Sequence, residues 1–465
     1  MYKYATLMVC LLIALCGCSR TPNYFSQVDV DGKDQIVGRY PLKDSIGKSM
    51  TCYHFIYDNN KRLLSVEYLK NGLLSKGSYF GENVAKVSIS YQDGFQEFYY
   101  RNMYGNHTQE NQGNYSTRLK LDSNGNPVAR FNYNKMKVLS KDYFGVAQYA
   151  WKIDKQGRRI SSMRLDEKGN RISDSNGVYE VRWQYNENGE PIVISHHGKD
   201  GQLAADTSNV AITKYQYDDN GNKIEYSYYG TDEQRVLDAG GTSYQKFSHD
   251  EFGNRIEIRN YGIDGELKEN INGIAIAKMR FDNRNNLIEE SAYGIDGQLK
   301  EIDGIATRKY LLDNKGNRIE IQNYGVDGTL KQDGKLAIRK FLYDYHRNIL
   351  EFSNYDSKNN FIMADGMAIV EMEYDLKGKN TRISYYDTSK KKCVYENNML
   401  SYHANEFSYD ENDNLIEKRF INVSGEVAPP HWAVGWAIVK YERNEHGEVT
   451  KTKFLSPEGR VLSEM

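Results

Sequence analysis

Acidic residues and histidines are the first places to look for chemistry in this chain, because a glycosidase needs two carboxylates and a metal site needs several donors. Glutamates stand at one position of a recurring pattern, at Glu257, Glu289, Glu320 and Glu351. A catalytic pair should occur once and converge, whereas a residue present in every copy serves the repeat itself. We therefore interpret these glutamates as solvated strand residues and expect no catalytic residue and no enzymatic activity.

Metal binding and cofactor binding are not predicted either. The turn clusters Asp218–Asn222 and Asp410–Asn414 are rich in oxygen ligands, but they lack the twelve-residue EF-hand spacing and the glycine-rich nonapeptides of calcium β-rolls. The adjacent pair His196 and His197 lies on an expected strand, where neighbouring side chains face opposite sides. We interpret the acidic clusters as turns and the histidines as surface residues.

One aromatic segment is a candidate ligand contact. The stretch "VAPPHWAVGWA", residues 427–437, contains His431 and two of the four tryptophans, Trp432 and Trp436. Aromatic rings on a rigid sheet can stack on sugars or anchor a protein partner. The alternative is a C-terminal cap that covers the last hydrophobic stripe of a repeat array.

The secondary structure that would position these residues can be predicted from an internal sequence repeat. The turn motif Gly-Asn-x-Ile and its variants recur 31 or 32 residues apart, and weaker copies extend it both ways, to about a dozen units. The turn residues are Asn222, Asn254, Asn286, Asn317 and Asn348, with weaker copies at Asn126, Arg158, Glu190, Lys379, Asn414 and Glu448.

Each unit is predicted to be a long antiparallel hairpin. Before one turn, Ala275, Ala277, Met279 and Phe281 alternate with Ile276, Lys278 and Arg280, which is the period of a half-buried strand. The Asp-x-x-Gly-Asn turn follows, then a second strand that ends in "YG-x-DG", a strong hairpin signal. A short third segment closes the unit. Because a lone hairpin is marginal in water, neighbouring copies must cover each apolar stripe.

The bulk composition agrees with sheet. The chain has 38 Tyr and 39 Gly but only 7 Pro, and a formal net charge of -2. Tyrosine and glycine enrichment suits strands joined by tight turns, and the balanced charge gives no electrostatic reason to expect nucleic-acid binding. We predict an all-β, elongated array of hairpins, either solenoid-like or a continuous twisted sheet, and a monomer.

The repeats resemble a known family. "YDDNGNKIEYSYYG", from Tyr217 to Gly230, is similar to the tyrosine-aspartate, or RHS-type, repeats of bacterial surface and secreted proteins. The period of about 32 residues is longer than the roughly twenty-residue unit that the family favours, and no RHS core motif or toxin domain follows. The resemblance therefore implies a small repeat-bearing lipoprotein rather than a toxin-enclosing shell.

The N-terminal residues resemble a bacterial targeting signal. Lys3 precedes an apolar run from Ala5 to about Cys16, which has the length of a signal-peptide core and is too short to span a membrane. Leu15 to Cys18 resembles the bacterial lipobox, which implies cleavage before Cys18 and acylation of its thiol. Ser19 resembles the residue that permits transfer to the outer membrane. We expect an envelope protein held in the membrane by lipid on Cys18.

The repeats and the N-terminal signal together predict six segments of the chain. We predict a signal peptide at 1–17, the lipidated Cys18 with a flexible tether at 18–38, degenerate repeats at 39–140, regular repeats at 141–387, a loop insertion at 388–408, and C-terminal repeats with a cap at 409–465. Cys52 and Cys393 remain after processing. In a linear array they are too distant to pair, so we expect two free thiols.

The predicted function is a non-enzymatic binding or interaction scaffold that acts through its β-repeat surface, with a protein or a glycan as ligand. The alternatives are a carbohydrate-active hydrolase of the periplasm or surface, which would need a pocket of non-repeating acids, and a purely structural envelope scaffold.

Overall fold

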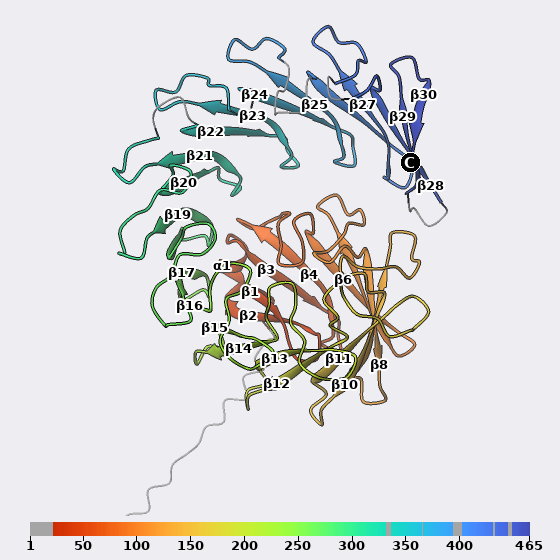
Figure 1. Ribbon diagram of the computed structural model, residues 1–465, viewed down its shortest axis with the longest axis vertical. Coiled ribbons are helices and arrows are strands. Elements are labelled where there is room, and N and C mark those ends of the chain that lie inside the picture. Colours follow the sequence, from red (N-terminus) through yellow and green to blue (C-terminus); the bar gives the residue numbers. More distant parts are fainter. Residues whose placement is uncertain (1–21, 332–335, 365, 394–401, 431–432, 445–448) are drawn as a thin grey trace, which may run out of the picture.

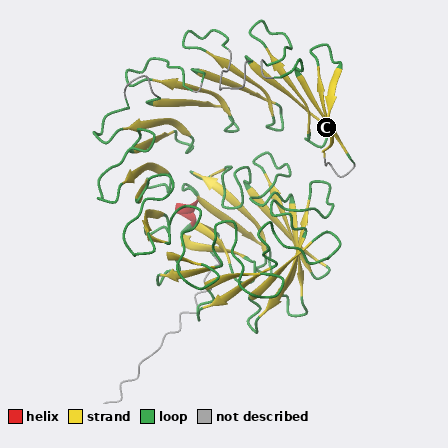
Figure 2. Ribbon diagram, in the orientation of Figure 1, coloured by secondary structure: helices red, strands yellow, loops and turns green. Residues whose placement is uncertain are grey.

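The computed structural model describes residues 22–331, 336–364, 366–393, 402–430, 433–444 and 449–465. Within them the chain forms one 30-stranded antiparallel sheet and a single short helix (Figures 1 and 2). The predicted fold class is confirmed, and of its two variants the continuous twisted sheet is the one observed. Sequence neighbours are also neighbours in the sheet, except that β1 lies between β2 and β3 and that β4 pairs with β6.

The N-terminal layer contains β1 (Tyr24–Val30), β2 (Ile36–Leu42), α1 (Asp44–Gly47), β3 (Cys52–Tyr57), β4 (Leu63–Lys70), β5 (Leu73–Leu74), β6 (Lys86–Gln92), β7 (Phe95–Arg101), β8 (Ser116–Leu121) and β9 (Pro127–Tyr133).

The outer arc continues with β10 (Gln148–Ile153), β11 (Arg159–Leu165), β12 (Glu180–Tyr185), β13 (Pro191–His197), β14 (Ile212–Tyr217), β15 (Lys223–Tyr229), β16 (Tyr244–His249), β17 (Arg255–Tyr261), β18 (Ile276–Phe281) and β19 (Leu287–Tyr293).

It ends with β20 (Thr307–Leu312), β21 (Arg318–Tyr324), β22 (Ile338–Tyr343), β23 (Ile349–Tyr355), β24 (Ile369–Tyr374), β25 (Asn380–Tyr386), β26 (Ala404–Tyr409), β27 (Leu415–Ile421), β28 (Ile438–Arg443), β29 (Val449–Leu455) and β30 (Val461–Glu464).

The local chemistry of the turns is as predicted. In the turn of the β14–β15 hairpin, the Asp218 carboxylate accepts the backbone N–H groups of Asn220 and Asn222 and the side-chain amide of Asn222. Gly221 between them has a φ of 75°, in the left-handed region that glycine tolerates. The same arrangement recurs along the sheet, so the oxygen-rich clusters are occupied by their own backbone.

The strands alternate as predicted. Along β18, Lys278 and Arg280 are exposed whereas Ala277, Met279 and Phe281 are half-buried on the other face. Just before the first strand of most hairpins lies the alanine of the third segment, which is almost fully buried. Ala275 donates its N–H to the carbonyl of Tyr293, and the equivalent alanines of other units repeat this bond. The apolar face of each unit is thus covered by the adjoining units.

The sheet does not run in a straight line but winds into a spiral, with the N-terminal strands on the inside of the later ones (Figure 1). Side chains of the N-terminal layer contact turns of the outer arc that are 125 to 278 residues later in the sequence. Arg39 donates to the Gly221 carbonyl at 2.7 Å, and the Thr51 backbone N–H to that of Arg284 at 2.8 Å. These turns of the outer arc are therefore also interlayer contacts.

Two predictions are corrected by this winding. The flexible tether expected at 18–38 is wrong from Tyr24 onward, because β1 and β2 form a hairpin whose Tyr24, Phe25 and Val28 are buried in hydrophobic clusters. The linear array assumed for the cysteines is also wrong. Cys52 and Cys393 are nevertheless free thiols, as predicted.

The predicted insertion at 388–408 lies partly outside the described residues, since 394–401 are not described. Within the described part, Lys392 closes an isolated bridge with Tyr386 and β26 begins at Ala404. The flanks of the segment therefore belong to the regular repeat pattern.

Candidate functional site

The residues that break the repeat pattern meet where the β1–β2 turn lies against the first units of the outer arc. Two adjoining cavities, of about 480 Å³ and 250 Å³, share Asp34, Gln112, Arg130 and Arg159 in their walls. We refer to the two cavities together as the interlayer site. Its walls come from segments far apart in sequence, namely the β1–β2 turn, the segment before β8, and strands β9 to β12.

Arg159 is the centre of the aromatic part. Its guanidinium carbon lies 4.8 Å from the ring centroid of Trp151 and 4.5 Å from that of Trp183, so the cation is held between the two indoles. The guanidinium also donates to the Asp34 carboxylate at 3.0 Å, and the Arg159 backbone N–H donates to the Gly32 carbonyl at 2.7 Å. Arg159 thereby fixes the β1–β2 turn against the outer arc.

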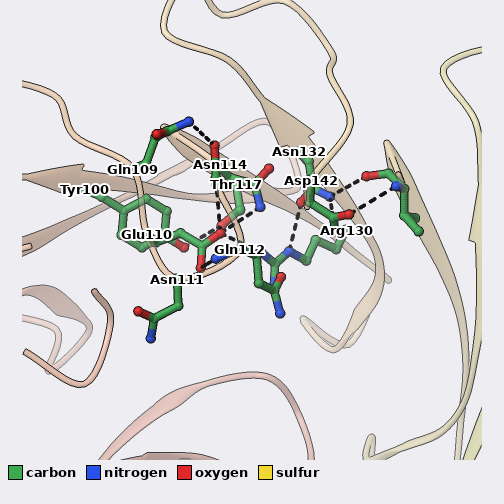
Figure 3. Close-up of polar contacts among 12 residues, drawn as sticks. Tyr100, Gln109, Glu110, Asn111, Gln112, Asn114, Thr117, Arg130, Asn132 and Asp142 are labelled. Atoms are coloured by element: carbon green, nitrogen blue, oxygen red, sulfur yellow. Dashed lines mark hydrogen bonds and ion pairs between the residues drawn. The ribbon is translucent and has the colours of Figure 1, made fainter. Parts of the chain in front are cut away.

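Arg130 is the centre of the polar part (Figure 3). Its Nη2 lies 3.8 Å from Glu110 Oε1, and its Nε donates to the Asn132 side-chain oxygen at 3.1 Å. Burial disfavours the charge of Arg130, but the nearby Tyr100, Asp34, Glu110 and Tyr149 outweigh it and raise its pKa above the usual value. The guanidinium is therefore a permanent cation within the wall.

The two carboxylates of this network have structural partners. Glu110 accepts the N–H of Gln112 at 2.9 Å and the side-chain amide of Asn114 at 2.7 Å. Asp142 accepts the backbone N–H of Val146 at 3.0 Å and the Tyr149 hydroxyl at 2.7 Å. Both therefore close turns in the way that Asp218 does, instead of presenting a free oxygen to a substrate.

Four polar atoms of the walls have no hydrogen-bond partner within the described protein: Gln112 Oε1, Arg130 Nη2, Trp151 Nε1 and Arg159 Nε. Trp151 is only 8% exposed, so its indole N–H is buried beside the smaller cavity. A buried donor without an acceptor costs free energy, on the order of 1–3 kcal/mol. The walls thus contain three buried donors and one buried acceptor, which a polar molecule reaches only when neighbouring side chains move.

The sequence-predicted candidates lie elsewhere. Glu257 pairs with Arg259 at 2.5 Å and with Lys278 at 3.7 Å, and Glu289 pairs with Arg280 at 2.7 Å. The other two recurring glutamates, Glu320 and Glu351, accept hydrogen bonds from the side chains of Gln322 and Ser353. The ring nitrogens of His196 and His197 bond separate backbone carbonyls, those of Val210 and Gly201. The described residues contain no group of three His, Cys, Asp or Glu suited to a metal ion.

The aromatic candidates are only partly placed. The ring of Trp436 packs against Phe420 and Phe454, with centroids 5.8 Å and 4.9 Å away, in the hydrophobic cluster of the last units. This is the packing that a C-terminal cap would make. His431 and Trp432 lie outside the described residues, as does Cys18. No helix within the described ranges has the length and apolar character needed to cross a membrane.

The sequence analysis missed Trp151 and Trp183, although a signal exists. Both stand three residues before the turn Asp or Asn, a position that other units fill with Tyr, Phe, Met or Leu. Tryptophan in two consecutive units, with the double arginine Arg158–Arg159 between them in the sequence, departs from the repeat at one place. Comparing residue types at equal unit positions would have found this departure.

No family model matches the chain. No curated protein matches it either. Among solved structures the chain is similar to TcdB2-TccC3-TEV, at 13% identity and a TM-score of 0.35, over 91% of this chain and 24% of that one. It is also similar to TcdB2-TccC3, at 14% identity and a TM-score of 0.32, over 95% of this chain and 24% of that one.

A third similar structure is the Tc holotoxin pore of Photorhabdus luminescens, at 11% identity and a TM-score of 0.28, over 94% of this chain and 25% of that one. The chain spans about a quarter of the length of these solved chains. The chain is an all-β repeat protein, as its own strand pairing establishes.

Proposed function

We propose that this protein is a non-enzymatic binding scaffold of the bacterial cell envelope, and that the interlayer site takes a polyhydroxylated ligand of the glycan class. The observation that carries the proposal is the Trp151–Arg159–Trp183 stack beside four unpartnered polar atoms. Sugars present both apolar ring faces and a dense set of hydroxyl groups, so they need aromatic surface together with donors and acceptors.

Charge and size support a neutral polar ligand. Three arginines, Arg130, Arg159 and Arg164, face three carboxylates, Asp31, Asp34 and Glu110, so the walls carry no large excess of either sign. Cavities of about 480 Å³ and 250 Å³ suit one or two sugar rings. At the rim, Phe144 is 58% exposed and adds apolar surface on which a further ring can lie.

The ligand proposal is tested by Trp183→Ala, since Trp183 is half-buried and lines the smaller cavity. We expect at least a tenfold loss of affinity for any glycan that the unaltered protein binds, measured on a glycan array and then by calorimetry. Phe247→Ala is the matched control, because Phe247 stands at the same unit position but lines neither cavity of the interlayer site. Equal affinity in Trp183→Ala, or no glycan binding by the unaltered protein, contradicts the proposal. Release of sugar products would instead indicate a hydrolase.

The envelope location rests on the lipobox-like sequence that ends at Cys18. A multiply acylated cysteine anchors stably, because each buried methylene contributes roughly 0.8 kcal/mol. We expect Cys18→Ser to move the protein from the membrane fraction to the soluble fraction of fractionated cells. Unchanged membrane partitioning would contradict lipid anchoring at Cys18. Protease treatment of intact cells then distinguishes a surface-facing protein from a periplasmic one.

A further inference from the structure

A second interlayer cavity, which shares no lining residue with the first, has an unusual charge. It has a volume of about 510 Å³ and lies between β4 of the N-terminal layer and the turns of the outer arc from β18 to β23. Lys70, Lys76, Arg318 and Arg347 line it, and none of its lining residues is an aspartate or a glutamate. Four cations therefore face one enclosed space without a carboxylate in its wall.

Arg347 is the residue that breaks the repeat here. It occupies the left-handed turn position, with a φ of 64°, where other units have Gly221, Gly253, Gly316 or Asn285. A long side chain in this conformation costs roughly 1 kcal/mol relative to glycine, so the arginine is kept at an energetic cost. Asp313, in the turn of the preceding unit, does not pair with Arg347. Its carboxylate already accepts the backbone N–H groups of Lys315 and Asn317.

The guanidinium of Arg347 is buried and makes few hydrogen bonds within the described protein. The residue is 6% exposed, its Nη2 reaches only the Lys70 carbonyl at 3.4 Å, and its Nη1 has no hydrogen-bond partner among the described residues. Burial, followed by the positive charges of Arg318, Arg347 and Lys76, lowers the pKa of Lys70. The cluster is thus a set of mutually repelling cations whose mutual repulsion an anion would relieve.

Arg318 and the neutral residues complete the site. The guanidinium carbon of Arg318 lies 3.7 Å from the Tyr310 ring centroid, which orients it, and Ser75 and Asn317 add polar groups to the wall. A fork-shaped arginine with neighbouring lysines is the donor set that binds tetrahedral oxyanions in proteins.

We propose that this cavity binds a doubly charged tetrahedral oxyanion, phosphate or sulfate, held by Arg347, Lys70, Arg318 and Lys76. The site is separate from the glycan site proposed above, so either proposal can fail alone. The anion would also join the two layers, because Lys70 and Lys76 come from the N-terminal layer and the arginines from the outer arc.

The test is Arg347→Asn, which installs the residue type of Asn285 at a position that favours it. We expect the unaltered protein to bind inorganic phosphate or inorganic sulfate with one site per chain, measured by calorimetry at constant ionic strength in chloride. In Arg347→Asn the affinity should fall at least tenfold while the melting temperature without anion stays equal or rises, because backbone strain is relieved.

Lys390→Asn is the matched control, since Lys390 also has a left-handed backbone but is exposed far from the cavity. It should bind as the unaltered protein does. Lys70→Gln is a second variant that should also weaken binding tenfold without changing the turn. No saturable binding of either anion, or equal affinity in Arg347→Asn, Lys70→Gln and Lys390→Asn, overturns the proposal.

Discussion

At the scale of single residues, departures from the repeat carry the information about function. Asp218, Asn222 and Ala275 have counterparts in most units and serve turns or strand contacts. Trp151 and Trp183 share a unit position that the other units fill with different residue types, Arg347 is likewise an exception at its own position, and all three line cavities between the layers. In a repeat protein, candidate functional residues are thus best found by comparing the units and selecting the residues that differ from the common type at their position.

One ion network predicts a measurable pH dependence. Glu67 accepts hydrogen bonds from His54 at 3.2 Å and from Lys86 at 2.8 Å. The hydrogen bond from His54, and after it the one from Lys86, lower the pKa of Glu67 to about 2, although burial of the carboxylate acts to raise it. A carboxylate with a depressed folded pKa stabilises the fold above its unfolded pKa, near 4.5, and this contribution is lost as the pH falls toward 2.

We therefore expect Glu67→Gln to lower the free energy of unfolding by about 1 kcal/mol at pH 7, a value reduced for solvent screening. The difference from the unaltered protein should shrink between pH 4.5 and pH 2 in urea denaturation. The exposed Glu187→Gln serves as control and should show no such pH-dependent difference. A pH-independent difference for Glu67→Gln would mean that its effect is steric rather than electrostatic.

At the scale of elements, the hairpin unit could be predicted because each of its features is local. The Asp-x-x-Gly-Asn turn, the two-residue alternation and the "YG-x-DG" corner all lie within one period of the sequence, and all are found. What was missed within the unit is the asparagine that precedes two of the Tyr-Gly corners, at Asn260 and Asn323. Asn260, 2% exposed, donates to the Ile274 carbonyl at 2.9 Å, and Asn323 makes the equivalent bond to the Leu336 carbonyl.

The first hairpin shows the limit of local patterns. Residues 24–38 fall within the predicted tether, although Asp31 closes the β1–β2 turn as Asp218 closes its own, by accepting the N–H groups of Lys33 and Gln35. Its buried Phe25 and Val28 are covered by Tyr53, Phe55 and Val66, so the hairpin is held by tertiary packing that its own sequence does not encode. The interlayer site was missed for the same reason, since Asp34 and Arg159 meet across 125 residues.

At the scale of the whole molecule, winding converts a one-dimensional array into a two-layer body. A straight repeat array gains stability only from adjacent units. Here the turns of the outer arc also contact the N-terminal layer. The interlayer site and the proposed anion cavity therefore exist only while the two layers stay together. Closure of the layers should therefore be separable from folding of the individual hairpins.

Gly253 offers this separation. Its φ is 76°, and a Cβ atom placed on it would lie 2.3 Å from the ring of Tyr40 in the N-terminal layer. Gly297 has a φ of 74° in an equally tight corner but no heavy atom within 4 Å of such a Cβ. Gly253→Ala and Gly297→Ala thus carry similar backbone strain, roughly 1 kcal/mol, and only the first pushes the layers apart.

The thiol of Cys52 reports loosening of the first hairpin, which carries Tyr40 on β2, because Cys52 is 0% exposed and packs with Tyr24 and Leu69 under that hairpin. We expect Gly253→Ala to raise the rate of maleimide labelling at Cys52 at least tenfold, measured by peptide mass spectrometry under native conditions. Gly297→Ala should leave that rate near the unaltered value. If both variants label Cys52 at the same rate, the hairpins and the layer contact unfold together, and the N-terminal layer is an inseparable part of the repeat sheet rather than a body docked on its turns.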